Sequence, residues 1–372
     1  MSRAREWLER IRALPLERRV KILNVCGGHE RSISNAGLRA ALPPQVEIIP
    51  GPGCPVCICP EEDIYEAIQL ARHEAVTLVA FGDMLRVPVN GPKSEPRSLE
   101  QAKAAGADIR PIASPDEAAR LAQALAPRPV IFLAAGFETT TAPVAAMLAA
   151  GAPANLFVLL SGRRTWPIVA QLLSSGRPGF DAIVAPGHVA TVMGPEEWQF
   201  VVDDYGYPAA VAGFNPDTLL AATYSVLRQL LEGRPFLDNC YESAVHAGGN
   251  PVGKRLLDSV MAVVDANWRG IGIVPASGFV LREAYAAHDA RRRFRSYADD
   301  ARKRAGQMPA GCECARVVLG QIYPNQCPLY GAACHPHHPI GPCMVSDEGA
   351  CRIWWAHGVR PPQKAPRSAT AA

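Results

Sequence analysis

The chain has 372 residues, 48% of them apolar and 20% charged, which excludes a disordered or fibrous protein and suits two or three globular domains. Its 38 Lys and Arg residues nearly balance 35 Asp and Glu residues. No stretch combines clustered basic residues with aromatic ones, so we expect no nucleic-acid binding. The most apolar stretch, residues 129–160, is interrupted by Glu138 and internal prolines, so we expect no membrane-spanning helix.

The first 20 residues combine charged side chains with Trp7, Leu8 and Ile11 in the pattern of an amphipathic helix rather than of a signal peptide. We therefore expect a soluble protein of the cytoplasm. Its eleven cysteines are an odd number, and in a reducing compartment they favour metal binding or thiol chemistry over structural disulfides.

Short apolar runs alternate with helical patterns from residue 20 to about residue 234, as in parallel strands that helices cover on both faces. The expected strands are residues 21–25, 46–49, 77–81, 109–112, 130–134, 156–160, 182–185 and 209–212. Acidic residues after a proline mark helix starts near residues 60 and 115. The alternation predicts an α/β fold of doubly wound parallel sheets, and eight strands suit two sheets better than one.

We expect one α/β domain at residues 15–127 and a second at residues 128–235. A third, smaller domain at residues 236–372 is expected to contain helices at 253–264 and 280–304 and a Cys-rich tail from residue 311. The tail has too few periodic apolar residues to build its own core, so we expect a bound cluster or zinc ion to order it.

The first chemical motif, Cys26-Gly27-Gly28-His29, follows an expected strand and opens a helix. Ligands of open α/β sheets bind at such strand ends, glycines allow close backbone approach, and a helix N-terminus favours a thiolate. Cys26 and His29 can therefore face one metal ion. The alternative is a tight turn with a buried cysteine and a capping polar residue.

The second motif, residues 51–60, places Cys54, Cys57 and Cys59 between a strand and a helix. A C-x-x-C pair near a helix N-terminus suits a reversible disulfide or a soft metal. A structural zinc ion would need two more ligands, which Cys26, His29 or Cys59 can supply.

The third motif, residues 136–141, places Glu138 and three threonines at another strand end. Glu138 can accept a hydrogen bond or a proton in a cleft, although a capped helix without chemistry explains the motif equally well. Residues 82–84 and 186–188 occupy equivalent strand ends. Together these motifs suggest one crevice lined by strand termini.

The fourth motif is the tail, whose six cysteines have the spacing C-x-C-x12-C-x6-C-x8-C-x7-C. Six thiols satisfy a four-thiolate cluster and leave one pair over, and the absence of repeated C-x2-C pairs favours iron–sulfur over zinc. His335, His337 and His338 lie among prolines, and we interpret them as loop residues rather than as ligands.

Taken together the motifs resemble the HypD family, whose members help to build the iron part of the [NiFe]-hydrogenase active site. The matching segments follow the family's order over nearly the whole chain and are residues 26–29, 51–57, 81–84, 136–140, 186–189, 211–214, 268–270, 327–331, 341–346 and 348–351. Such an extended match is not expected from a shared fold alone.

The resemblance implies two Rossmann-like α/β domains plus a smaller Cys-rich domain with a [4Fe–4S] cluster. It assigns four cysteines to the cluster, namely Cys312, Cys327, Cys334 and Cys351, and makes Cys314 and Cys343 an adjacent thiol pair. Cys26 is then the thiolate that holds iron carrying cyanide and carbon monoxide. The implied partners are a HypC-like small chaperone and a HypE-like cyanide donor.

The sequence departs from the family pattern at several positions near the expected crevice. Glu30 and Arg31 stand where the family has Thr and His, Cys59 is an additional thiol, and Asn215 replaces an acidic residue. Residues 161–164 also lack the family's Asn-His. These departures are expected to alter the partner or the ligand while leaving the scaffold and the cluster intact.

The leading hypothesis is an iron–sulfur scaffold that assembles an Fe(CN)2CO group, with Cys26, His29, Cys54, Cys57 and Glu138 at its centre. One alternative is a thiol–disulfide oxidoreductase that resembles ferredoxin:thioredoxin reductase, in which the tail cluster passes electrons to Cys54 and Cys57. Another alternative is a structural metalloprotein whose tail binds zinc.

Overall fold

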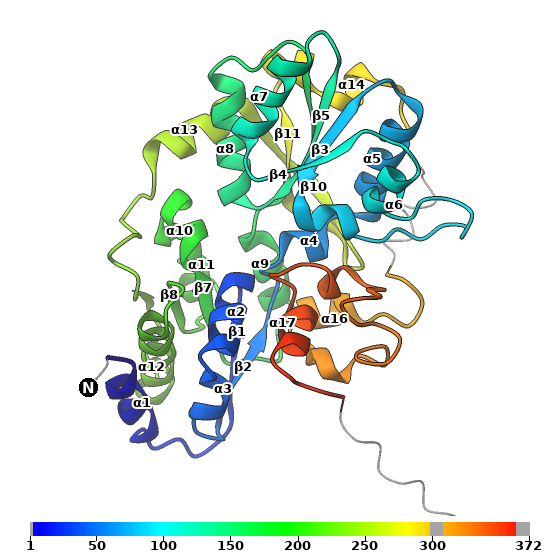
Figure 1. Ribbon diagram of the computed structural model, residues 1–372. Coiled ribbons are helices and arrows are strands. Elements are labelled where there is room, and N and C mark those ends of the chain that lie inside the picture. Colours follow the sequence, from blue (N-terminus) through cyan, green and yellow to red (C-terminus); the bar gives the residue numbers. More distant parts are fainter. Residues whose placement is uncertain (1–2, 298–307, 362–372) are drawn as a thin grey trace, which may run out of the picture.

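The computed structural model of the chain describes residues 3–297 and 308–361, which form two lobes, each built around a parallel β-sheet (Figure 1). The Cys-rich segment, drawn orange to red, lies against the lower lobe beside α2 and α4 (Figure 1). None of the helices in the described residues has the length and hydropathy needed to span a bilayer.

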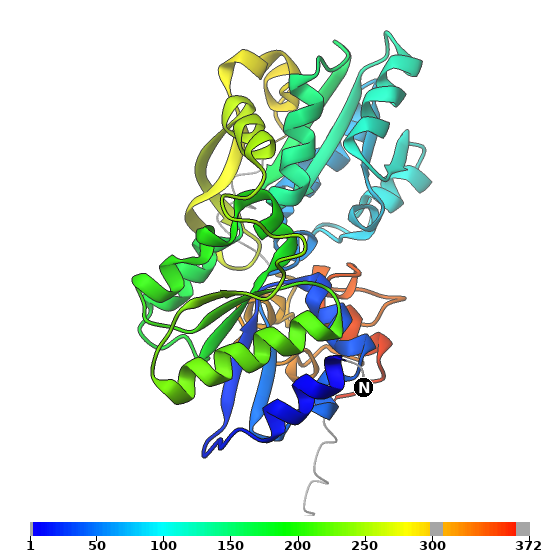
Figure 2. The same cartoon turned by 90° about the vertical axis from the view of Figure 1, so that its left-hand side faces the viewer.

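The lower lobe contains a five-stranded sheet with the order β2-β1-β7-β8-β9, in which every neighbouring pair is parallel. The strands are β1 (Val20–Asn24), β2 (Val46–Pro50), β7 (Ala182–Pro186), β8 (Ala209–Ala212) and β9 (Leu237–Asn239). Alternate residues of β1 face opposite cores, because Ile22 packs with α1 and α12 whereas Leu23 packs toward the lobe junction. The long helix α12 (Pro216–Glu232) crosses this sheet in Figure 2.

The upper lobe contains a four-stranded parallel sheet with the order β4-β3-β5-β6. The strands are β3 (Thr77–Phe81), β4 (Ile109–Ile112), β5 (Val130–Gly136) and β6 (Leu156–Gly162), and an antiparallel hairpin of β10 (Met261–Trp268) and β11 (Gly272–Leu281) packs beside them. Every residue of β5 and β6 is buried, as expected for strands with helices on both faces.

The helices that cover the sheets and connect the strands are short except for α1, α5, α7, α8, α12 and α13. They are α1 (Arg3–Arg12), α2 (Gly27–Asn35), α3 (Leu38–Ala41), α4 (Pro55–Ile58), α5 (Glu61–His73), η1 (Gly82–Arg86), α6 (Leu99–Ala104), α7 (Pro115–Leu125), α8 (Glu138–Ala149), α9 (Trp166–Ser174), α10 (Gly187–Met193), η2 (Pro195–Trp198), α11 (Phe200–Asp203), α12, α13 (Pro251–Val260), η3 (Glu283–His288) and α14 (Ala290–Arg293). The Cys-rich segment adds α16 (Cys314–Val318), η4 (Pro324–Gln326), η5 (Pro342–Met344) and α17 (Ala350–Ala356).

The α/β class and the parallel sheets are confirmed, and each of the eight expected strands coincides with a strand of the structure. The division of the chain differs from the expected domains at 15–127 and 128–235. Strands β1 and β2 pair with β7, β8 and β9, whereas β3 and β4 pair with β5 and β6. Apolar periodicity identifies a strand and its burial but not the strand beside it, which is why contiguous domains were the simplest expectation.

The expected helices after residue 235 are only partly present. The helix expected at 253–264 ends at Val260, where β10 begins; along residues 262–265 of this strand, partly buried and exposed side chains alternate. The helix expected at 280–304 is wrong for its described part, which holds the end of β11, η3 and α14; its last residues lie outside the described range. Asp289 starts α14 by accepting a hydrogen bond from the Arg291 backbone N–H.

The largest hydrophobic core joins both sheets to the Cys-rich segment. It contains Leu23 of the lower sheet, Leu133 of the upper sheet, and Val317, Met344 and Trp354 of the C-terminal segment. The segment was expected to depend on a bound group for its order. In the structure its few apolar side chains pack into a core that other parts of the chain build.

Candidate metal and thiol centre

Cys26 lies two residues beyond the end of β1 and is the residue that precedes α2, with its side chain buried. The second motif packs directly on it: the Gly27 N–H donates to the Gly53 carbonyl at 3.0 Å. A Cβ at Gly53 would lie 2.3 Å from the Cys26 Cα, so this contact requires glycine. The two strand-end motifs therefore form one unit at the carboxyl edge of the lower sheet.

The sulfur of Cys26 faces a histidine from a third strand end, because the His188 Nδ1 lies 3.5 Å away. Burial raises the pKa of the Cys26 thiol, while the backbone N–H groups of His29 and Gly28 act in the opposite direction. Burial also lowers the pKa of His188 to about 4. At neutral pH the pair is thus a thiol beside a neutral imidazole, and metal binding would release the thiol proton.

His29 has both ring nitrogens engaged. Its Nε2 lies 2.9 Å from the Ala212 carbonyl oxygen and its Nδ1 lies 3.1 Å from the Asn24 Oδ1, and the side chain is fully buried. Burial lowers the pKa of His29 to about 3. In this arrangement His29 ties α2 to β8 and orients the Cys26 turn without directing a free nitrogen at a ligand.

Cys54 and Cys57 form a disulfide bond across the first turn of α4, with a Cα–Cα distance of 5.3 Å. The pairing is the one expected from the C-x-x-C spacing. Cys59 lies apart from this pair, because its sulfur is 3.4 Å from the Ser161 hydroxyl. Burial, with a further contribution from Asp63, raises the pKa of Cys59 to about 12, so this additional thiol is protonated and inert.

A small cavity of about 10 Å³ connects the N-terminal motifs with the tail, and it has room for about one water molecule. The residues around it include Cys26, Cys54, Cys343 and Glu348. Burial raises the pKa of Glu348 to about 7, and the nearby carboxylate of Asp83 adds to the rise. The structure therefore brings three of the four sequence motifs to one internal space.

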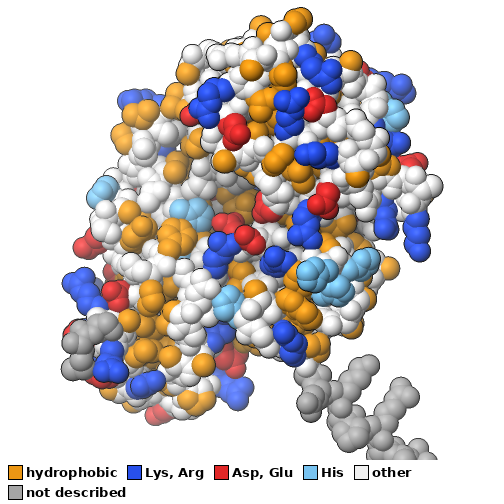
Figure 3. Space-filling model, viewed as in Figure 1, with side chains coloured by type: hydrophobic (Ala, Val, Ile, Leu, Met, Phe, Trp, Pro, Cys, Tyr) orange, Lys and Arg blue, Asp and Glu red, His pale blue; other side chains and the backbone are white. Residues whose placement is uncertain are grey.

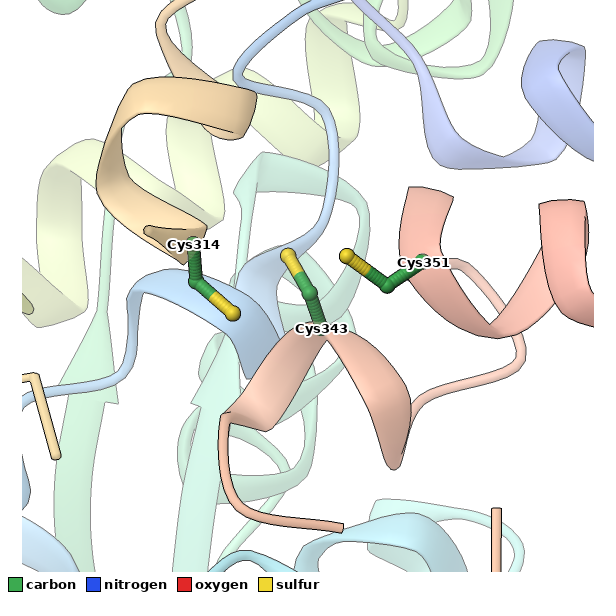
Figure 4. A group of neighbouring side chains, drawn as sticks. All are labelled: Cys314, Cys343 and Cys351. Carbon is green, nitrogen blue, oxygen red and sulfur yellow. The ribbon is translucent and has the colours of Figure 1, made fainter. Parts of the chain in front are cut away.

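The tail thiols converge as well. The sulfurs of Cys314, Cys343 and Cys351 lie within 4.8 Å of one another, and all three side chains are buried. Figure 4 shows them pointing toward a common space from α16, η5 and the start of α17. Hydrogen bonds from Cys314 and Cys351 lower the pKa of Cys343 to about 6, so one thiolate is stable here near neutral pH.

The other three tail cysteines lie around this group. The Cys312 sulfur is 3.3 Å from that of Cys314, and the Cys334 sulfur accepts a hydrogen bond from the Ile340 N–H at 3.3 Å. A Cβ at Gly341 would lie 2.4 Å from the Cys312 sulfur, so the glycine allows the thiols to gather. Cys327 is buried at 8% exposure.

This donor set fits a thiolate-bound metal centre. Thiolates are the ligands of iron–sulfur clusters and of zinc, and sulfurs of a tetrahedral zinc site would lie about 3.8 Å apart. The close group combines Cys351, a predicted cluster ligand, with Cys314 and Cys343, the predicted thiol pair. The division of the six cysteines into four ligands and one pair stays a prediction.

Glu138 does not reach the Cys26 cavity. Its carboxylate is fully buried and accepts hydrogen bonds from the Thr165 N–H and hydroxyl, both at 2.7 Å, at the start of α9. The residues that surround the cavity do not include it. Its described contacts therefore join the start of α8 to the start of α9; no described side chain caps α8, and a role of Glu138 in the chemistry stays a prediction.

A second carboxylate beside Glu138 yields a pH-dependent prediction. Glu197 is 9% exposed, and its Oε2 is buried without a hydrogen-bond partner in the described residues. Burial raises the pKa of Glu197 from 4.5 to about 8, with a further contribution from Glu138. The folded chain thus keeps a proton that the unfolded chain loses near pH 4.5. The contribution of this carboxyl group to the free energy of unfolding is therefore fully present below pH 4.5 and is lost as the pH rises to about 8.

Glu197→Gln is expected to remove this loss. The free energy of unfolding of the variant should exceed that of the wild type increasingly between about pH 5 and pH 8, by up to about 1.4 kcal/mol per pH unit. Urea denaturation at several pH values measures it. The control is Glu196→Gln on the same short helix, whose carboxylate accepts the Gly248 N–H. Equal changes in both variants would show a net-charge effect instead.

The two unusual residues after His29 have separate partners. Glu30 is buried and accepts hydrogen bonds from the Arg39 guanidinium and the Trp354 indole N–H, each at 2.7 Å. Arg31 is exposed and pairs with Asp347 at 3.0 Å. The Glu30 carboxylate is therefore paired between α2, α3 and α17.

Other departures from the family pattern also have structural partners. Asn215 caps α12 by accepting the Thr218 N–H at 2.9 Å. Arg163 donates to the Asn267 carbonyl of β10, and Arg164 donates its backbone N–H to Ser277 of β11. These residues attach the hairpin to the upper sheet.

The tail histidines form a surface patch, visible in pale blue in Figure 3. The ring centroid of His335 lies 6.3 Å from that of His337 and 6.2 Å from that of His338. His337 and His338 are exposed. Their position agrees with the interpretation as loop residues.

Sequence reasoning gave little weight to His188 and overlooked Glu348. His188 has the strand-end signal that identified Cys26, but an isolated Gly-His after a strand is weak evidence. Glu348 carried no such signal, since only the packing of the tail against Gly27 brings it to the cavity; a Cβ at Gly27 would lie 2.5 Å from the Glu348 Cβ.

Comparisons with known proteins agree with this arrangement of motifs. A HypD family model, described as "Hydrogenase formation hypA family", matches residues 2–358. The hydrogenase maturation factor HypD of Azotobacter vinelandii is 39% identical over 351 residues, which cover 92% of this chain and 90% of that protein.

Two further relatives carry the same name. HypD of Rhodobacter capsulatus is 40% identical over 353 residues, and HypD of Escherichia coli is 37% identical over 350 residues; each alignment covers 92% of this chain and 90% of the relative. The match of motifs, fold and sequence over this length shows that the chain belongs to the HypD family of hydrogenase maturation factors.

Proposed function

We propose that this protein is the cytoplasmic scaffold on which the Fe(CN)2CO group of a [NiFe]-hydrogenase is assembled. The proposal includes a resident [4Fe–4S] cluster in the Cys-rich tail, a HypC-like chaperone and a HypE-like cyanide donor. The observation that carries it is the single cavity bordered by Cys26, Cys54 and Cys343.

Cys26 suits the anchoring of the iron substrate. A low-spin iron with cyanide and carbonyl ligands favours a soft, electron-rich donor, and a thiolate is such a donor. The backbone N–H groups of Gly28 and His29 favour the ionised sulfur, and His188 lies 3.5 Å from it. Phe214, which is 39% exposed, borders the Gly28 backbone at the outer side of this turn. Figure 3 shows a hollow on this face where the two lobes meet.

The tail supplies the ligands for the cluster. Cys312, Cys327, Cys334 and Cys351 are the proposed ligands, of which Cys312 is partly exposed and the other three are buried. Their soft sulfurs suit an iron–sulfur cluster, which would supply electrons one at a time. Val317, Val318 and Ala350 lie beside the cavity and exclude bulk water from its tail side.

Cys26→Ala tests the proposal directly. The variant is expected to lose the infrared bands of cyanide and carbon monoxide and to fail in hydrogenase maturation, because the soft anchor is gone, while the iron and sulfide content of the tail is kept. The measurement is infrared spectroscopy of anaerobically purified protein produced with its maturation partners. The matched control is Cys59→Ala, since Cys59 is also buried but contacts Ser161 instead of the cavity.

Bands that persist in Cys26→Ala would place the iron on another residue. Bands that are absent from the wild type as well would contradict the assembly proposal. Iron and sulfide analysis of the same samples separates a cluster from a zinc site in the tail.

A second function, thiol–disulfide exchange, is favoured by the disulfide itself. Cys54 borders the cavity from one side and Cys343, whose pKa is about 6, borders it from the other. The Cys343 thiolate would attack the Cys54 sulfur, and Cys57 would leave as a thiolate and take up a proton. The Cys314 thiolate would then attack Cys343 and release Cys54, so that two electrons pass from one dithiol to the other.

Replacing the resolving thiol should trap the intermediate of this exchange. Cys314→Ser is expected to accumulate a Cys54–Cys343 mixed disulfide, which mass mapping of alkylated peptides detects. In the double variant with Cys343→Ser the species should disappear. A mixed disulfide that contains Cys59 instead of Cys54 would contradict the proposed route.

A further inference from the structure

A fully buried arginine lies in a turn that contacts both the helix with Cys57 and the Cys-rich tail. Arg269 occupies the tight turn that joins β10 to β11, and none of its side chain is exposed. Its backbone N–H donates to the carbonyl of Ile58, the last residue of α4, at 3.0 Å. The turn is thereby fixed against the helix that contains Cys57.

The guanidinium of Arg269 is only partly satisfied. Its Nη2 donates to the Pro88 carbonyl at 2.7 Å and lies 3.3 Å from the Glu61 Oε2. The Nε and Nη1 atoms are buried and have no hydrogen-bond partner among the described residues. Because a guanidinium stays protonated in proteins, this side chain is a permanent buried cation with spare donors. Such a group is costly unless negative charge lies near it; the Glu61 carboxylate supplies one such charge, and the Nε and Nη1 donors remain for another.

The turn that contains Arg269 also packs against the tail. Gly270, the next residue of the turn, packs on the tail, since a Cβ there would lie 2.6 Å from Met308 and 2.9 Å from Ala315, the neighbour of Cys314. The turn thus connects α4 to the first cysteines of the tail.

We propose that Arg269 is a positioning residue that holds a buried positive charge beside the thiolates of the tail and stabilises the reduced state of the cluster bound there. This inference rests on the proposed [4Fe–4S] cluster. Each electron that enters a thiolate-bound cluster adds a negative charge, and a fixed cation in a medium of low polarity lowers the free energy of that state. Net charge and hydrogen bonds to sulfur are among the factors that set cluster potentials.

The experiment is a redox titration of the cluster in the full chain, purified anaerobically and followed by electron paramagnetic resonance. Arg269→Met removes the charge at similar volume, and Arg269→Lys keeps the charge. We expect Arg269→Met to lower the equilibrium constant for one-electron reduction by about tenfold, a shift of about 59 mV to more negative potential. Arg269→Lys should stay within about threefold of the wild type.

Two further variants separate electrostatics from damage to the fold. Glu61→Gln removes the carboxylate that faces Arg269, and it should shift the potential in the positive direction, opposite to Arg269→Met. Arg163→Met is the matched control, because Arg163 is also buried but donates to the Gly162 and Asn267 carbonyls near Asp63. It should leave the potential within about threefold in the same equilibrium.

Each result decides the matter. An unchanged potential in Arg269→Met, or equal shifts in Arg269→Met and Arg163→Met, would overturn the role of Arg269 while leaving the cluster in place. If Arg269→Met does not fold, a potential in Glu61→Gln that fails to rise overturns it. A wild-type protein without iron and sulfide would overturn the inference together with the proposed cluster.

Discussion

Glu30→Ala is expected to lower the free energy of unfolding by about 3 kcal/mol, the lower end of the range for removing one partner of a buried ion pair. The lower end applies because the Arg39 side chain is 25% exposed, whereas that of Glu30 is 2% exposed. The substitution also leaves the Trp354 indole N–H without its acceptor, and the partly buried Arg39 guanidinium, 5.1 Å over the Trp354 ring, would lose its carboxylate partner. Urea denaturation monitored by tryptophan fluorescence measures the change.

Two variants serve as controls for this prediction. Arg31→Ala breaks the neighbouring pair with Asp347, whose side chains are 49% and 69% exposed, and it should change stability by at most about 0.5 kcal/mol. Arg39→Met combined with Glu30→Ala should recover part of the loss, because no buried charge then remains unpaired. A loss in Arg31→Ala as large as that in Glu30→Ala would contradict the difference between the two sites.

Removal of any one proposed cluster ligand is expected to eliminate the cluster completely and to destabilise the tail. Cys351→Ala should eliminate the iron and sulfide of the purified protein and expose the tail to proteolysis, since a three-ligand site holds a cluster poorly and the tail has few apolar anchors of its own. The same is expected for Cys312→Ala, Cys327→Ala and Cys334→Ala. Metal analysis and limited proteolysis of anaerobic samples are the measurements.

The matched controls are Cys314→Ser and Cys343→Ser, which alter the same close group of sulfurs as Cys351. They should keep the cluster and lose one pair of titratable thiols. If Cys314→Ser or Cys343→Ser loses the iron while Cys327→Ala keeps it, the ligands are the close group and the proposed division of the six cysteines is wrong.

The sequence predicts the elements of this fold better than their partners. Apolar runs at residues 130–134 and 156–160 identify strands that the structure buries completely, because full burial leaves a continuous apolar signal. Nothing local distinguishes β2, which pairs with β1, from β3, which joins the other sheet. The end of α13 was missed because residues 261–264 continue an apolar run that suits a helix and a strand equally.

The same limit applies to the candidate site. Strand ends and Gly-rich turns locate Cys26, Cys54 and Cys57 from the sequence, since those features have local causes. The partners of Glu30 are not local in this sense, because the Trp354 indole lies 324 positions further along the chain. Its role could be recognised only once the tail was packed against α2.

The order of strands in the lower sheet has a consequence for synthesis on the ribosome. The four strands of the upper sheet lie within residues 77–162 and can pair as soon as that stretch has emerged, whereas β1 must wait for β7 at residues 182–186. During that interval the edge of β1 opposite β2 is unpaired, and such edges associate readily with other chains. Since segments of a domain tend to fold as units while the chain grows, the four-stranded upper sheet can form before the lower sheet. The Cys26 turn of the growing chain is therefore accessible to thiol reagents and free metal ions until β7 pairs with β1 and α17 packs on α2.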